Sequence, residues 1–181
     1  MNITPFKEEE NLKNIFSKIA KTDLKNYIRE IVELVINSTL SKENIKSILT
    51  KYSIQKVEII KSELLEILIA YLNFILNDNL ITTIEKENFE FLKMYFEIKD
   101  RDFYKYKLQE IKSIINRQFE RIYTDNLIIQ SETESNDLLQ DIFGLNYDQF
   151  DKMKESFVIK SIEQGAEITN LDTANVKLTK K

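Results

Sequence analysis

Asp78-Asn79-Leu80-Ile81-Thr82-Thr83-Ile84-Glu85 is echoed 47 residues later (125 − 78 = 47) by Asp125-Asn126-Leu127-Ile128-Ile129-Gln130-Ser131-Glu132. The same offset continues downstream, where it relates Leu92 to Leu139, Phe96 to Phe143 and Phe103 to Phe150. Each copy has the pattern of a helix end, an Asp-Asn turn that suits a left-handed backbone, and a new helix. The sequence therefore predicts tandem helix-turn-helix units, similar to EF-hands in outline, over about residues 71–117 and 118–164.

The composition predicts an all-α fold. The 181 residues include only 2 Gly and 1 Pro, whereas sheet proteins need turn residues often. Apolar residues recur at helical spacing in about eight segments, and the segment over about residues 56–76 is apolar over most of its circumference, as expected of a central helix. We expect one helical domain over residues 1–165 and a mobile, polar tail over residues 166–181.

Local signals predict where several helices begin and end. The N-cap candidates are Thr22 or Asp23, Ser41, Thr82, Ser131 and Asn146, and the last three have capping-box spacing to Glu85, Glu134 and Gln149. Gly144 suits a left-handed position at a helix end. The pattern also predicts a single long helix over about residues 101–123 and a loose arm over residues 1–7.

At the duplicated turns the chain resembles the tellurite-resistance TerB-like helical proteins, whose unit contains Asp-Gly-x-Ile-x-x-x-Glu between two helices. The matching residues are Asp78, Ile81 and Glu85 in the first copy and Asp125, Ile128 and Glu132 in the second. The second helix of each unit ends in a short break, here at residues 96–98 and 143–146. The two helices predicted over about residues 24–52 are a candidate for a degenerate third unit, with its turn at residues 37–41 and its break at residues 52–54. Asn79 and Asn126 stand where the family usually has Gly, and Asn tolerates that backbone conformation.

The resemblance covers about residues 71–164. It implies a role in stress or phage-defence systems, scaffolding at membranes and, for some members of the family, binding of metal ions.

The residue inventory excludes several kinds of chemistry. His and Cys are absent, which removes His-based acid–base catalysis, Ser–His–Asp hydrolysis and a conventional zinc site. Two glycines are too few for a phosphate-binding glycine-rich loop. Paired carboxylates could act as in glycosidases, but 30 acidic residues on a helical protein produce many accidental pairs. We therefore predict no catalytic residues, no cofactor and no enzymatic activity.

The duplicated acids, Asp78, Glu85, Asp125 and Glu132, are weak candidate metal ligands. A calcium loop needs oxygen ligands at positions 1, 3, 5 and 12 and Gly at position 6, and loops that start at Asp78 or Asp125 lack this pattern. We prefer the interpretation that the aspartates hold the turns while the glutamates lie at favourable helix N-termini.

The net charge indicates which class of partner the protein is expected to bind. A net charge of −4 and a pI near 5.2 argue against a generic nucleic-acid partner, and the basic residues between 101 and 121 are interspersed with acids. The longest uncharged apolar run, residues 67–76, is much shorter than the roughly 18 residues of a membrane helix, so no membrane span is predicted.

These observations favour a cytoplasmic, non-enzymatic module that binds another protein, as a scaffold in a bacterial stress or defence system. The alternatives are an acidic immunity or inhibitor protein that covers a basic toxin, and a weak carboxylate metal-ion binder. Partner contacts are predicted at Phe157, Tyr147 and Tyr104, and self-association stays open.

Overall fold

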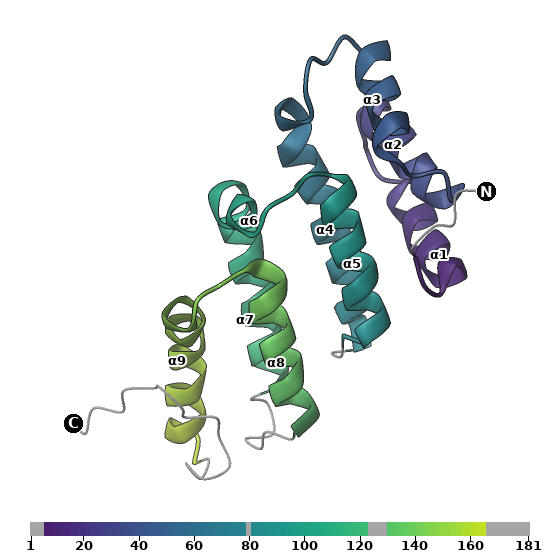
Figure 1. Cartoon of the computed structure of the whole chain (residues 1–181). Helices are drawn as coiled ribbons and strands as arrows, with labels where there is room; N and C mark the ends of the chain where they lie inside the picture. The colour runs from purple at the N-terminus through teal and green to yellow at the C-terminus, as the bar shows by residue number, and fades with distance from the viewer. Residues whose placement is uncertain (1–5, 79–80, 123–129, 166–181) are drawn as a thin grey trace. The chain divides into compact units, whose positions relative to one another are not determined.

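The computed structural model describes residues 6–78, 81–122 and 130–165, and every element within these ranges is helical (Figure 1). The elements are α1 (Glu9–Ile19), α2 (Asn26–Ile36), α3 (Lys42–Lys51), η1 (Val57–Ile60), α4 (Lys61–Ile75), η2 (Leu76–Asp78), α5 (Thr83–Tyr95), α6 (Asp100–Tyr106), α7 (Leu108–Ile122), α8 (Gln130–Phe143) and α9 (Tyr147–Glu163), where η1 and η2 are 3₁₀ turns. The predicted all-α class is confirmed. The predicted tail over residues 166–181 lies outside the described residues.

The chain divides into two compact units, so the prediction of one domain over residues 1–165 stays a prediction. Unit 1 contains Met1–Asn77 and Thr82–Lys99, and unit 2 contains Asp78–Ile81 and Asp100–Lys181. Each unit has its own central helix and is described by itself.

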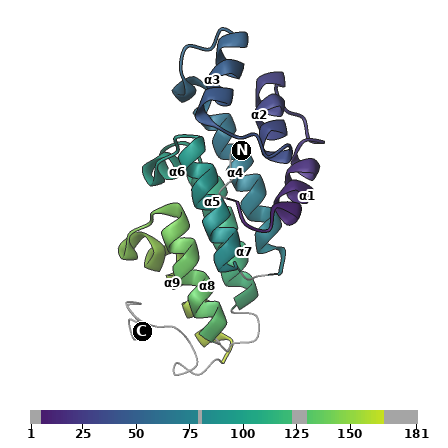
Figure 2. The ribbon, with the colours of Figure 1, turned by 45° about the vertical axis from the view of Figure 1, so that its right-hand side comes forward.

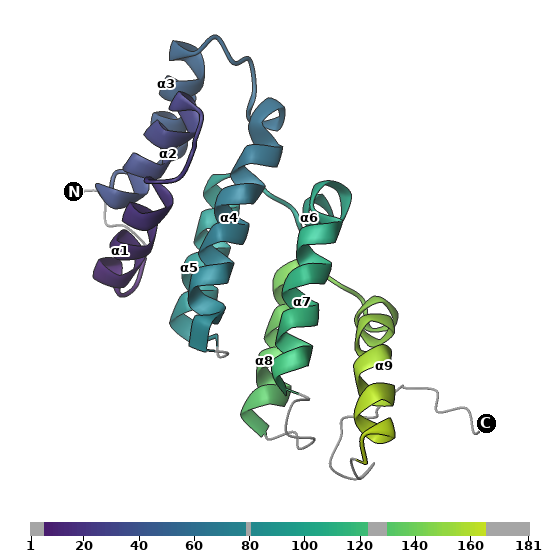
Figure 3. The ribbon, with the colours of Figure 1, turned by 180° about the vertical axis from the view of Figure 1, so that it is seen from behind.

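In unit 1, α4 packs against both α1 and α5, and α2 packs against α1 and α3. Figures 1 and 3 show α4 and α5 side by side. Leu64, Leu65, Leu68 and Leu72 of α4 are fully buried, and each buried leucine of this kind contributes about 1.5–3 kcal/mol. The broad apolar surface predicted for residues 56–76 therefore belongs to a segment whose helix, α4, has neighbours on more than one side.

In unit 2, α7 contacts α6, α8 and α9, and α7 lies beside α8 in Figures 1 and 2. Its buried apolar side chains, Ile111, Ile114, Ile115 and Phe119, follow the helical period. The ring of Phe119 meets that of Phe150 of α9 edge-on, with centroids 5.3 Å apart. An aromatic core therefore ties α9 to α7.

Three predicted N-caps are present. The side chain of Ser41 accepts a hydrogen bond from the Asn44 amide at 3.1 Å. Thr82 begins α5 with a complete capping box, and Asn146 begins α9 with another. These caps satisfy amides at the helix N-termini that have no partner within the helix.

The predicted breaks share one backbone geometry. A residue within two positions of each helix end has a positive φ, which is 55° at Ser53, 54° at Glu97 and 59° at Gly144. The amide of the following residue donates to a carbonyl five positions earlier, namely Ile54 to Leu49 (2.8 Å), Ile98 to Lys93 (3.0 Å) and Leu145 to Gln140 (3.1 Å). This pattern is that of the Schellman helix end.

The helix boundaries agree with the offset in the sequence. Helix α7 begins 47 residues after α4 (108 − 61 = 47), α8 begins 47 after α5 (130 − 83 = 47), and α9 begins 47 after α6 (147 − 100 = 47). The equivalence of the two segments as tertiary repeats stays a prediction.

The single helix predicted over residues 101–123 is wrong, because the chain is interrupted at Lys107 between α6 and α7. The described residues therefore contain nine α-helices, where about eight were expected. Backbone hydrogen bonds continue on both sides of the interruption. The Lys107 amide donates to Phe103 O at 2.8 Å, and the Lys107 carbonyl accepts from the Ile111 amide at 3.0 Å.

Helix α6 also packs on α8, and there Phe103 meets Phe143 with ring centroids 5.7 Å apart. Tertiary packing sets this bend, since no Pro or Gly marks it in the sequence.

Three predicted helix starts differ from the structure. Helix α2 begins at Asn26, and the hydroxyl of Thr22 instead donates to Ile19 O at the end of α1, at 2.8 Å. Helix α4 begins at Lys61 and follows the 3₁₀ turn η1. Helix α8 begins at Gln130, so Ser131 lies inside the helix and is not its N-cap.

Candidate functional site

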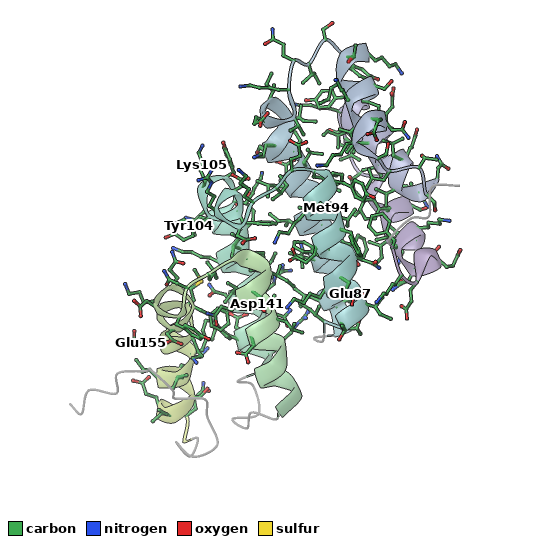
Figure 4. The ribbon with its side chains drawn as sticks, in the orientation of Figure 1. Glu87, Met94, Tyr104, Lys105, Asp141 and Glu155 are labelled. Atoms are coloured by element: carbon green, nitrogen blue, oxygen red, sulfur yellow. The ribbon has the colours of Figure 1, made fainter. Side chains whose placement is uncertain are left out.

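Helix α6 exposes two aromatic side chains, Tyr104 (43% exposed) and Tyr106 (42%), with Lys105 between them. The Lys105 ammonium lies 4.6 Å from the centroid of the Tyr106 ring, within the range of a cation–π interaction. Asp102 and Phe103 of this short helix are buried. Figure 4 shows Tyr104 and Lys105 extending outward from α6. We call Tyr104, Lys105 and Tyr106 the α6 surface.

The other two predicted contact residues have different environments. Tyr147, the first residue of α9, is 72% exposed. Phe157 is half-buried, and its ring centroid lies 5.6 Å from that of the fully buried Phe119. Phe157 thus packs at the edge of the core of unit 2, while Tyr104 and Tyr147 are accessible.

Of the predicted metal ligands, Glu85 is held within the capping box of α5. Its Oε2 accepts hydrogen bonds from the amide of Thr82 at 2.9 Å and from the Thr82 hydroxyl at 2.8 Å. The side chains of Asp78 and Glu132, and the whole of Asp125, lie outside the described residues. In the part of the chain that the structure describes, no three acidic side chains gather as ligands for one metal ion.

A carboxylate of α2 joins α3 through two hydrogen bonds. Glu30 Oε1 accepts from Lys51 Nζ at 2.6 Å and from the Tyr52 hydroxyl at 2.6 Å. The hydrogen bond from Lys51, followed by that from Tyr52, lowers the pKa of Glu30. The charge pair and the hydrogen bond connect two helices at the surface of unit 1.

Glu63 of α4 makes the same set of contacts with the start of α2 and the residue before it. Its Oε1 accepts from Lys25 Nζ at 2.6 Å and from the Tyr27 hydroxyl at 3.2 Å. Partial burial acts to raise the pKa of Glu63, but the hydrogen bonds from Lys25 and from the backbone outweigh it, so the pKa is lowered. The Tyr27 and Tyr52 rings meet edge to face, with centroids 5.8 Å apart, and place the two Lys-Glu-Tyr groups next to each other. The sequence pattern did not reveal these groups, because their members come from separate segments.

The segment before α1 is docked onto α5. The backbone amide of Lys7 donates to Asn88 Oδ1 at 2.9 Å, and Asn88 Nδ2 donates to Lys7 O at 2.7 Å. Phe6 is only 8% exposed, with its ring centroid 6.2 Å from both Phe91 and Tyr95. The predicted loose arm is therefore wrong for Phe6 and Lys7, while residues 1–5 lie outside the described residues.

Asn88 is itself buried (3% exposed) and also makes a hydrogen bond to Tyr71 of α4. Burial, followed by the negative charge of Glu85, raises the pKa of the Tyr71 hydroxyl, and the hydrogen bond with Asn88 acts in the opposite direction. Sequence reasoning missed this arrangement because Lys7 and Asn88 are 81 positions apart.

None of the described helices has the length and apolar character that a membrane crossing needs. Comparisons with known protein families, with curated proteins and with solved structures found no match to the chain. The resemblance to TerB-like proteins therefore rests on the short motifs around Asp78 and Asp125 alone.

Proposed function

We propose that the protein is a non-enzymatic protein-interaction module that binds its partner through the α6 surface. The observation that carries the proposal is the pair of exposed tyrosines, Tyr104 and Tyr106, on a helix anchored by the fully buried Phe103. Tyrosine is enriched at the energetic centres of interfaces, because it buries much area at little conformational cost. An anchored helix also loses little freedom on binding.

We place this module in the cytoplasm as a scaffold of a bacterial stress or defence system, with a protein partner and no nucleic acid. The setting follows from the TerB-like resemblance. The absence of His and Cys supports a role without catalysis. The negative net charge supports a protein partner over a nucleic acid.

The test is capture of partners from the native host by wild-type protein and by a Tyr104→Ala/Tyr106→Ala variant. We expect the variant to keep its melting temperature and to lose affinity for the specific partner by about 30-fold or more, because interface tyrosines often contribute about 2 kcal/mol. Gln109→Ala, an exposed change on the neighbouring helix α7, serves as the control and should retain the partner. Equal retention by wild type and the tyrosine variant would refute the role of the α6 surface.

The alternative is an acidic immunity or inhibitor protein, supported by the net charge of −4. Such a protein would capture a single basic toxin domain, and its association rate would fall steeply with salt. Several large co-purifying subunits would contradict this alternative, whereas a single toxin partner would contradict the scaffold.

A further inference from the structure

Four residues on one face of α5 bind Phe6 and Lys7, the segment before α1, through hydrogen bonds, an ion pair and ring contacts. Glu87, Asn88, Phe91 and Tyr95 recur at the spacing that aligns side chains along a helix. We call them the α5 site, and Glu87 is labelled on α5 in Figure 4. The site belongs entirely to unit 1.

The α5 site recognises the backbone of its occupant through Asn88. The side-chain amide of Asn88 pairs with both the N–H and the C=O of Lys7, at 2.9 and 2.7 Å. Such a pairing is independent of the occupant's side chain but requires a backbone whose polar groups are free to pair with it. With the segment in place Asn88 is 3% exposed, so the two bonds give its buried amide the partners that burial requires.

Two further contacts specify the side chains of the occupant. Phe6 packs against two aromatic rings: its ring meets that of Phe91 edge to face and that of Tyr95 at a tilt. The Lys7 ammonium lies 2.5 Å from Glu87 Oε2, which selects a cation at the position after the aromatic residue. The site therefore fits an aromatic residue followed by Lys or Arg.

The connection between this segment and α1 is strained. Glu8, between Lys7 and the first residue of α1, has φ 48° and ψ 49°, a left-handed conformation that is unfavourable for a residue with a Cβ. Release of Phe6 and Lys7 from the α5 site would let Glu8 relax, and this relaxation offsets part of the free energy that release costs.

We propose that the α5 site is a peptide-binding site that the protein's own Phe6-Lys7 segment occupies, and that a partner segment with an aromatic residue followed by a basic residue displaces it. The internal segment is tethered beside the site at a high effective concentration, so it holds the site closed until a competing segment arrives. The inference does not depend on the α6 surface, and either can fail while the other stands.

The experiment uses the full chain and a fluorescent peptide with the sequence of residues 4–10, Thr-Pro-Phe-Lys-Glu-Glu-Glu. Phe6→Ala in the protein weakens the internal segment without changing the α5 site. We expect this variant to bind the peptide at least tenfold more tightly than wild type does, measured by fluorescence anisotropy. A peptide in which the phenylalanine is replaced by alanine should bind the variant at least tenfold more weakly than the native peptide.

A charge exchange tests whether Glu87 selects the cation of the occupant. Glu87→Lys, added to the Phe6→Ala protein, should bind a peptide with Lys7→Glu more tightly than the native peptide and so reverse the preference. The control is Glu58→Lys, which makes the same charge change at an exposed residue of the 3₁₀ turn η1 in unit 1, outside the site, and should keep the preference for the native peptide.

Three results would overturn the proposal. The first is equal affinity of wild type and Phe6→Ala protein for the peptide, and the second is no change of preference with Glu87→Lys. The third is concentration-dependent dimerisation of wild type that Phe6→Ala abolishes in sedimentation, which would assign the site to a second copy of the chain.

Discussion

Replacing Gly144 with alanine is expected to destabilise the protein by about 2–5 kcal/mol. The φ of Gly144 is +59°, and a left-handed conformation costs a residue with a Cβ about 1–2 kcal/mol. An added Cβ would also lie 2.2 Å from Asp100 Cβ and 2.9 Å from Asp100 Cγ, so the start of α6 must move. Overpacking of this kind costs a further 1–3 kcal/mol, roughly. Urea unfolding followed by far-UV circular dichroism measures the destabilisation.

A matched variant separates the two contributions. Gly165→Ala places a Cβ at a φ of +98° with no neighbouring atom within 4 Å, so it carries only the conformational cost. We expect the destabilisation in Gly144→Ala to exceed that in Gly165→Ala by about 1 kcal/mol or more. Asp100→Gly removes the clashing Cβ and should restore part of the stability of Gly144→Ala in a double-mutant cycle. Equal destabilisation at the two glycines, or no coupling with Asp100, would refute the close-approach argument.

Three other variants test the local arguments. Glu97→Gly removes a side chain from a left-handed position and should stabilise the protein by up to about 1 kcal/mol in urea unfolding, whereas destabilisation would show that the Glu97 side chain has a role of its own. The pKa values of Glu30 and Glu63 are lowered in the folded protein, so their stabilisation is complete above the ordinary carboxyl pKa of about 4 and is lost as the pH falls below it. Glu30→Gln/Glu63→Gln should therefore melt below wild type at neutral pH, with a gap that narrows in acid, and a constant gap would contradict the linkage. Thr82→Ala should cost about 1 kcal/mol by loss of the cap. Calorimetric titration of wild type with Ca²⁺, Mg²⁺ and Mn²⁺ should give no heat and no rise in melting temperature if Glu85 serves only the cap.

The local structure was predictable where the signal lies within a few residues. The caps at Ser41, Thr82 and Asn146 each join a side chain to a backbone amide three positions later. The positive φ of Gly144 could also be read from the residue type, because glycine takes that conformation at least cost. The N-cap predicted at Ser131 is wrong because the prediction also used a local signal. The spacing of capping residues recurs inside helices, so it does not by itself determine where a helix starts.

The candidate sites were predictable only in part. Of the three predicted partner contacts, Tyr104 and Tyr147 are exposed. The third, Phe157, is half-buried and packs against Phe119. Helical periodicity identifies an apolar face, and only the arrangement of neighbouring helices decides whether that face is covered.

The amino-acid sequence alone determined that this protein is helical, where most of its helices begin and end, and that it contains no His and no Cys. Those properties depend on residue inventory and on interactions within one or two helical turns. The tertiary structure decided the bend at Lys107, the two Lys-Glu-Tyr groups and the docking of Phe6 and Lys7 on α5. Their contacts join residues as far as 81 positions apart, or depend on which helices pack together, and neither is encoded in local spacing.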